Sequence, residues 1–161
     1  MHRILKLNSR TLLLLIAATC MGFVGFALVL QHFKGVLPCP LCVLQRYALL
    51  AITIFCLIGA LAGWSRVGAA LGEGAALSGV GLASYQLWVR SMPDVSCGFD
   101  PVETVVNQLL TAKLLPFLLV AEGTCADDNF RLFWLSLPQW GLLSFLGFSV
   151  LLVWIMLRRE E

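Results

Sequence analysis

Residues 11–30 read TLLLLIAATCMGFVGFALVL and contain no charged side chain. A helix needs about 20 apolar residues to cross a hydrocarbon core of about 30 Å, so this segment is long enough to span a membrane. Residues 47–64 and 132–157 also carry no charge, and residues 67–89 carry only Glu73. The sequence therefore predicts four membrane-spanning helices, at about residues 11–30, 47–64, 67–89 and 139–157.

The composition predicts an all-α membrane protein. The 161-residue chain is 60% hydrophobic and 12% charged, whereas a soluble domain has about 25% charged residues. A net charge of +2 is too small to indicate a nucleic acid partner. The first apolar run continues well past Cys20, too far for a cleaved signal peptide, so we interpret it as a retained helix. We expect one membrane domain, residues 1–161, folded as a four-helix bundle.

The distribution of basic residues predicts the orientation. Lys and Arg concentrate on the cytoplasmic side of membrane helices, which places both termini in the cytoplasm and two loops, about residues 31–46 and 90–138, outside. In the second loop, Asp100 and Pro101 form a helix-start signal, and an apolar stripe follows. We expect a short amphipathic helix there, lying on the membrane surface or packed against the bundle. The cytoplasmic basic residues are Arg3, Lys6, Arg10, Arg66, Arg158 and Arg159.

The six cysteines divide by their predicted depth. Cys20 and Cys56 fall in the middle of predicted spans, where a thiol behaves as a small apolar side chain. Cys39 and Cys42 form a Cys-x-x-Cys pair in the first outer loop, within the stretch PCPLCVLQR at residues 38–46. The second outer loop holds another pair, Cys97 and Cys125.

Three uses of the four outer cysteines are open. Four thiolates can bind zinc, but an oxidising compartment disfavours free thiolates. Two structural disulfides are possible, although a three-residue step makes Cys39–Cys42 a weak staple. A redox dithiol is favoured, because thiolates form near helix N-termini and cations. Cys42 is predicted just before the second helix, and Arg46 follows one turn later on about the same face.

The acceptor for such a dithiol is expected to be lipid-soluble. The chain shows no nicotinamide, flavin or haem motif, and the pair is predicted at the bilayer edge. Arg46 would then stabilise a thiolate or another anion there. As the alternative, Arg46 is a boundary cation whose side chain reaches outward to the headgroups.

The chain resembles the DsbB family of bacterial disulfide-forming membrane proteins. The resemblance rests on four spans, the outer Cys-x-x-Cys with Arg46 four residues beyond it, and the second cysteine pair in a long outer loop. The sequence GTCAD around Cys125 and the PQW entry to the last helix, residues 138–140, are also similar.

The resemblance implies a quinone-dependent oxidoreductase of the bacterial inner membrane, with its redox loops in the periplasm. Its partner would be a DsbA-like thioredoxin-fold oxidase, its cofactor ubiquinone or menaquinone, and its state a monomer. Cys97 would take the mixed disulfide with the partner, and Cys125 would attack Cys39. Cys42 would then be the thiolate beside the quinone, with Arg46 stabilising the charge.

Some features depart from that resemblance or stay open. Family members carry a His near the quinone soon after the third span's Tyr, whereas this chain reads Tyr85-Gln86. Gln86 is interpreted as a weak substitute, and His32 is not expected to be catalytic. Glu73 is either a functional carboxylate or the mark of a late start to its span. The alternative to an enzyme is a membrane scaffold whose outer loops are held by two structural disulfides.

Overall fold

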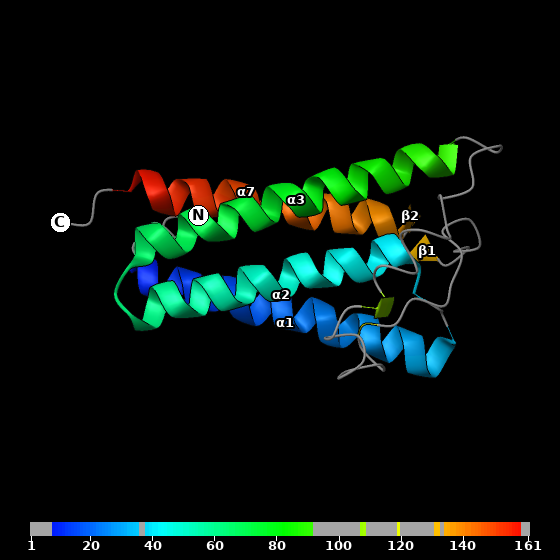
Figure 1. Cartoon of the computed structure of the whole chain (residues 1–161), viewed down its shortest axis with the longest axis horizontal. Helices are drawn as coiled ribbons and strands as arrows, with labels where there is room; N and C mark the ends of the chain where they lie inside the picture. The colour runs from blue at the N-terminus through cyan, green and yellow to red at the C-terminus, as the bar shows by residue number, and fades with distance from the viewer. Residues whose placement is uncertain are drawn as a thin grey trace.

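Four long antiparallel α-helices dominate the computed structural model (Figure 1), which describes residues 8–35, 38–91, 107–108, 119, 131–132 and 134–158. All four are long and apolar enough to cross a membrane. This confirms the predicted all-α, four-helix membrane fold. Of the amphipathic helix expected after Asp100, the structure describes only residues 107–108, which are helical, and the rest of that prediction lies outside the described residues. The four helices are α1 (Ser9–Lys34), α2 (Pro40–Leu61), α3 (Ser65–Ser91) and α7 (Leu137–Leu157).

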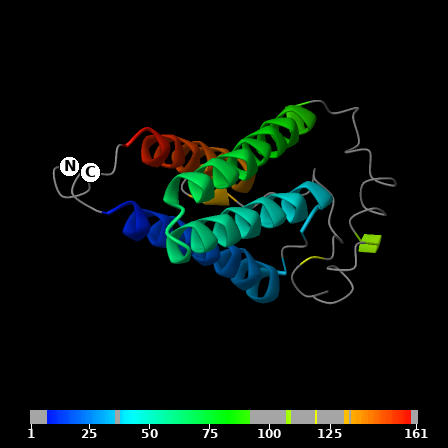
Figure 2. The ribbon, with the colours of Figure 1, turned by 60° about the vertical axis from the view of Figure 1, so that its left-hand side comes forward.

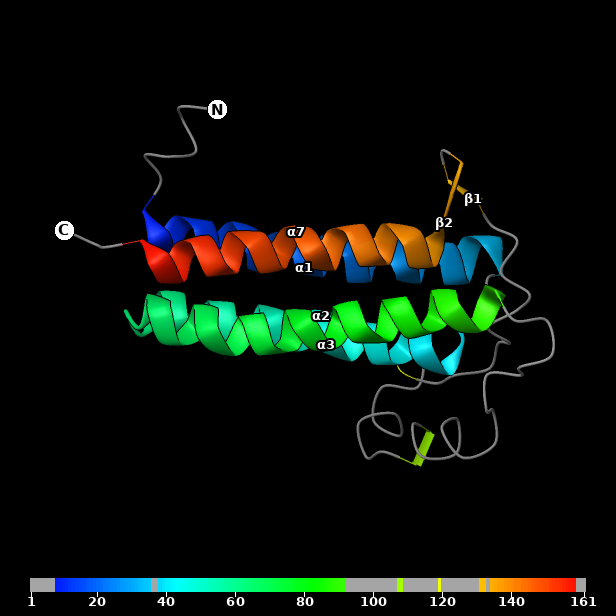
Figure 3. The ribbon, with the colours of Figure 1, turned by 90° about the horizontal axis from the view of Figure 1, so that it is seen from above.

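The helices pack mainly against their neighbours in the sequence. Helix α2 packs against α1 and α3, and α3 packs against α7. Seen from above, α1 and α7 form one layer and α2 and α3 the other (Figure 3). Contacts between α1 and α7 are sparse, so the bundle is least tightly closed along that side. Helix α1 begins at the end of the bundle where α7 stops (Figure 2).

Apolar side chains from all four helices fill one core along the bundle. Leu13, Ile52, Ala76 and Phe145 are among its members, one from each helix. The thiols of Cys20 and Cys56 are fully buried in the same core. This confirms that these two cysteines lie inside the bundle.

Helices α2 and α3 approach each other closely at Gly59 and Gly68. A Cβ atom built on Gly68 would lie 2.6 Å from the Gly59 Cα and 2.8 Å from the carbonyl oxygen of Phe55. Small residues let helix backbones approach closely in membranes. Small residues recur along the buried face of α3, at Gly68, Gly72, Ala76, Gly79 and Ala83.

The second helix begins earlier than its charge-free segment suggested. Helix α1 ends at Lys34 and is capped by Gly35, whose φ of 63° lies in the left-handed region that glycine favours at helix C-termini. Cys39 is the N-cap of α2, and Pro40 occupies the first helical turn, a position that proline favours. Cys42 therefore lies inside the first turn of α2. The prediction that it precedes the helix is wrong, because Arg46 is accommodated within the helix.

A short hairpin leads into α7. Strands β1 (Arg131–Leu132) and β2 (Leu135–Ser136) pair antiparallel. Trp134 lies in the turn with a φ of 70° and is 95% exposed. The predicted helix start at residues 138–140 is confirmed: Pro138 lies in the first turn, and the Gln139 side chain accepts a hydrogen bond from the Ser136 backbone N–H at 2.8 Å.

Glu73 lies within α3, eight residues after its start at Ser65. The helix thus begins well before Glu73, and the interpretation of Glu73 as the mark of a late start to the membrane span stays a prediction. Its carboxylate accepts a hydrogen bond from the Ser149 hydroxyl at 2.6 Å, which ties α3 to α7. Gln86 is thirteen residues further along α3, so at 1.5 Å per residue Glu73 is about 20 Å from it.

Candidate active site

The Cys39–Cys42 pair lies at the N-terminus of α2. The two Sγ atoms are 2.6 Å apart, and the Cys42 backbone N–H donates to the Cys39 Sγ at 3.3 Å. A small side-chain movement can join sulfur atoms this close in a disulfide. The free N–H groups at a helix start also attract negative charge, which is one contribution that stabilises a thiolate, the form that attacks disulfides.

Gln86 of α3 lies directly against both sulfur atoms. Its Nε2 is 3.3 Å from the Cys39 Sγ and 3.2 Å from the Cys42 Sγ. Its Oε1 accepts a hydrogen bond from the Gln45 Nε2 at 2.7 Å. The Gln86 side chain is fully buried, so this polar group is enclosed by the bundle rather than directed at lipid or water.

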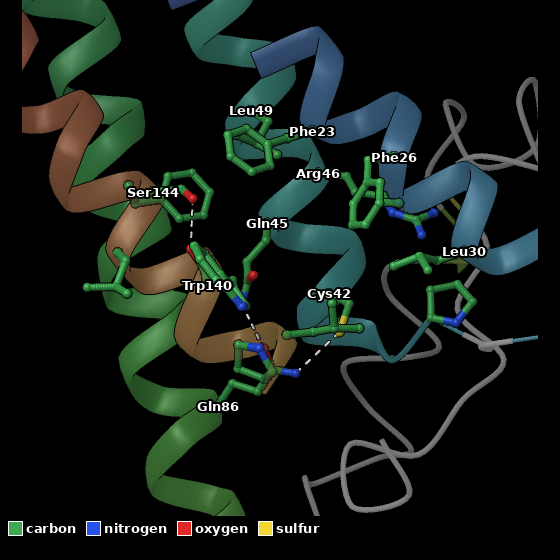
Figure 4. Close-up of a pocket in the computed structure, with 17 residues that line it drawn as sticks. Phe23, Phe26, Leu30, Cys42, Gln45, Arg46, Leu49, Gln86, Trp140 and Ser144 are labelled. Carbon is green, nitrogen blue, oxygen red and sulfur yellow. Dashed lines mark hydrogen bonds between the residues drawn. The ribbon is translucent and has the colours of Figure 1, made fainter. Parts of the chain in front are cut away.

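Arg46 lies one helical turn beyond Cys42 and is only 6% exposed. Its Nη1 donates to the Gln31 Oε1 of α1 at 2.9 Å. A boundary cation that reaches outward would be exposed. The structure instead places the guanidinium between α1 and α2, on the side of α2 that carries Cys42 (Figure 4).

A cavity of about 510 Å³ runs between α1 and α7 and reaches Cys42 of the dithiol. Cys42, Gln45, Arg46 and Gln86 line its polar end, as Figure 4 shows. Its remaining walls are mostly apolar, and the residues there include Phe23, Phe26, Leu30, Leu49, Pro138, Trp140, Leu143 and Phe145.

The apolar part of the cavity reaches the outside of the bundle. Phe26 of α1 and Leu143 of α7 both line it and are 44% and 52% exposed. The cavity lies on the side where α1 and α7 contact each other least. The cavity therefore leads from the outer surface of the bundle to Cys42.

The structure brings together some of the predicted site residues. Cys39, Cys42 and Arg46 meet at one end of α2, as the spacing indicated. Cys97 and Cys125 lie outside the described residues, so their predicted roles stay predictions. His32 hydrogen-bonds the Leu28 carbonyl oxygen on α1 and does not line the cavity.

Sequence reasoning undervalued Gln86 and missed Gln45. Gln86 was expected to be a weak substitute for a histidine, yet it contacts both sulfur atoms. Gln45 falls within the predicted outer loop at residues 31–46, and no role is predicted for it from the sequence. The sequence does hold a signal for Gln86: by helical spacing it falls on the same face of α3 as Gly79 and Ala83. That face is buried, and a polar side chain on a buried face needs a hydrogen-bond partner.

These features define a class of protein: a four-helix membrane protein with a dithiol at one end and an apolar cavity leading to it. Comparison with known proteins identifies the family. The model of the family described as "Disulfide bond formation protein DsbB" matches residues 9–155. The chain belongs to the DsbB family, which confirms the resemblance, and it is a multi-pass membrane protein of disulfide bond formation.

Curated relatives agree over nearly the whole chain. A protein of Herminiimonas arsenicoxydans named "Disulfide bond formation protein B" is 43% identical over 156 residues, covering 96% of this chain and 99% of the relative. Proteins of the same name from Ralstonia nicotianae and Cupriavidus metallidurans are 41% and 39% identical, each over 98% of this chain and at least 98% of the relative.

Proposed function

We propose that this protein is a thiol:quinone oxidoreductase of the bacterial inner membrane. It oxidises its Cys39–Cys42 dithiol with quinone and passes the new disulfide, through Cys97 and Cys125, to a DsbA-like periplasmic oxidase. The observation that carries the proposal is the cavity between α1 and α7, because it connects the lipid-facing surface to Cys42.

The residues of the cavity fit a quinone. A membrane quinone has a flat ring with carbonyl oxygens and a long apolar tail. Aromatic and aliphatic side chains such as Phe26, Trp140 and Leu143 suit the tail and the ring faces. Gln45 and Arg46 offer N–H donors for carbonyl oxygens at the polar end. Ubiquinone and menaquinone share these features, and both are candidates.

The redox chemistry balances without another reactant. Oxidation of the Cys39 and Cys42 thiols to a disulfide releases two electrons and two protons. A quinone in the cavity would accept both electrons and both protons and leave as the quinol. The chain's own contribution is electrostatic. The α2 N-terminus and the buried guanidinium of Arg46 both favour negative charge on the Cys42 sulfur.

Transfer to the partner uses cysteines that the resemblance assigns. A thiolate of the reduced partner attacks the Cys97–Cys125 disulfide at Cys97, which forms the mixed disulfide and releases Cys125 as a thiolate. Cys125 then attacks Cys39 of the Cys39–Cys42 disulfide, which releases Cys42 as the thiolate. Each step exchanges one disulfide for another, so the two electrons move from the partner to the dithiol beside the cavity.

The proposed topology puts this site on the periplasmic side. Arg10, Arg66 and Arg158 gather at the opposite end of the bundle, where Arg66 donates to the Arg158 carbonyl oxygen at 3.3 Å and Arg10 to the Ala60 carbonyl oxygen at 3.0 Å. Basic residues mark the cytoplasmic side, and disulfides form on the other side, in the periplasm.

Thiol trapping in membranes separates this enzyme from a scaffold with two structural disulfides. Cells depleted of quinone are treated with a maleimide that adds mass to every free thiol. The oxidase accumulates reduced Cys39 and Cys42 because their electrons have no acceptor. A chain that stays fully oxidised without quinone contradicts the proposal and supports the scaffold.

A further inference from the structure

We infer that Gln86 is a catalytic hydrogen-bond donor to the Cys39–Cys42 dithiol, and that Gln45 is the positioning residue that orients it. The inference rests on the proposed redox function of the dithiol. In this inference, Gln86 on α3 controls how readily Cys42 forms a thiolate and how readily the Cys39–Cys42 disulfide accepts electrons.

The contacts of Gln86 are directed at the reacting atoms. One amide nitrogen lies within 3.3 Å of both sulfur atoms. An N–H group bonds a charged acceptor about twice as strongly as a neutral one. Donation from Gln86 therefore stabilises a thiolate more than it stabilises a thiol or a disulfide. Because Gln86 is fully buried, water does not replace this hydrogen bond when it is lost.

Gln45 determines which end of the Gln86 amide faces the sulfur atoms. Gln45 Nε2 donates to Gln86 Oε1 at 2.7 Å, which leaves Gln86 Nε2 directed at the cysteines. If the amide rotated by half a turn, its oxygen would face the sulfur atoms and repel a thiolate. Gly141 of α7 leaves room for this arrangement, since a Cβ there would lie 3.0 Å from Gln45 Oε1.

Gln45 also lines the cavity. A series of hydrogen bonds therefore runs from the cavity through Gln86 to Cys42 (Figure 4), and Gln86 also donates to Cys39. The side chains of Gln45 and Gln86 are both amides, which neither gain nor lose a proton in the ordinary pH range. Its effect on the dithiol is therefore constant with pH, unlike that of a histidine, which titrates near pH 6.5.

The test measures the dithiol without quinone, in full-length protein carrying Cys97→Ser and Cys125→Ser. The reduced pair is alkylated with iodoacetamide over a range of pH, and its reduction is equilibrated against dithiothreitol. Four chains are compared in this background: the parent, Gln86→Leu, Gln45→Leu and Gln86→His. Tyr85→Phe is the matched control, because Tyr85 is the exposed neighbour of Gln86 on α3.

For Gln86→Leu, we expect the pH midpoint of alkylation to rise by about one unit, a tenfold loss of thiolate at neutral pH. The disulfide becomes about tenfold harder to reduce, because the reduced form has lost stabilisation. Gln45→Leu shifts both quantities in the same direction by less. Gln86→His restores an N–H donor and recovers most of the loss, and Tyr85→Phe changes neither quantity.

A packing role alone gives a different result. If Gln86 only fills space, Gln86→Leu lowers the thermal unfolding temperature and changes the alkylation plateau at high pH. The pH midpoint of alkylation and the reduction equilibrium then stay at the values of the parent protein. That outcome for Gln86→Leu overturns the inference. If Gln86→Leu does not fold, unchanged values in Gln45→Leu overturn it, because that variant keeps Gln86 in place.

Quinone reduction by the unmutated protein is measured in parallel. If the unmutated protein reduces quinone but Gln86→Leu changes neither the alkylation midpoint nor the reduction equilibrium, the inference is wrong and the proposed function stands. Conversely, absence of quinone reduction removes the proposed function, while a shifted midpoint in Gln86→Leu still shows that Gln86 acts on the dithiol.

Discussion

The amide nitrogen of Gln86 on α3 lies 3.2 Å from the Sγ atom of Cys42 on α2, although 44 positions separate the two residues in the chain. Two helices therefore build the redox centre, and the Cys-x-x-Cys motif supplies only the sulfur atoms. The donors that contact the sulfur atoms come from the α2 N-terminus and from Gln86, and Arg46 lines the same end of the cavity.

Replacing Arg46 with Ala is expected to raise the KM for quinone about tenfold or more, because a hydrogen bond to a charged donor is lost at the polar end of the cavity. Steady-state rates over a range of quinone concentrations measure the change. Arg66→Ala, at the opposite end of the bundle, is the matched control and should leave KM unchanged. An unchanged KM in Arg46→Ala would make Arg46 a structural cation.

Two glycines of α3 test the close contact between α2 and α3. Gly68→Ala places a Cβ 2.6 Å from the Gly59 Cα, and backbone atoms on both sides prevent local relief. We expect a loss of about 1–3 kcal/mol. Gly74→Ala meets no atom within 4 Å and should be neutral or stabilising by up to about 1 kcal/mol. Unfolding in mixed micelles measures both, and equal stabilities would contradict the packing.

The two buried cysteines should be dispensable for activity. Cys20→Ala and Cys56→Ala remove sulfur atoms from the apolar core, so we expect each to cost on the order of 1 kcal/mol. Quinone turnover should remain within about twofold of the unmutated protein. Loss of turnover in a variant that unfolds at the same temperature as the unmutated protein would show that one of these thiols takes part in electron transfer.

Cys97→Ala tests the order of the relay. With reduced DsbA as the electron donor, we expect quinone reduction to stop, because the mixed disulfide cannot form. With dithiothreitol as the donor, which can reach the dithiol directly, quinone reduction should continue, and Cys39–Cys42 should still be recovered as a disulfide. Full turnover of Cys97→Ala with DsbA would contradict the assignment.

The fold was predictable because absence of charge over about 20 residues is a strong signal. The sequence predicts the start of α2 at residue 47 instead of Pro40, because the charge of Arg46 interrupts the apolar run. In the structure Gln31 satisfies the guanidinium, and the helix continues through it. Helix propensity and residue spacing depend only on residues that are close in the sequence. They therefore give no information about a hydrogen-bond partner on another helix.

The same limit applied to the site. Cys39, Cys42 and Arg46 lie within one short segment, and their grouping followed from helical spacing. The contact of Gln86 with the sulfur atoms depends on how α3 packs against α2, which is determined by the small residues along that interface. Its role became visible only when both helices were in place.

The most direct test of the central claim follows quinone absorbance after mixing the purified protein with reduced DsbA and ubiquinone. The account predicts one quinone reduced for each DsbA disulfide formed, with turnover abolished in Cys39→Ser and in Cys42→Ser, while Cys20→Ala behaves as the unmutated protein. Full quinone turnover in Cys42→Ser would contradict the account, because electrons would then reach the quinone without the sulfur atom at the end of the cavity.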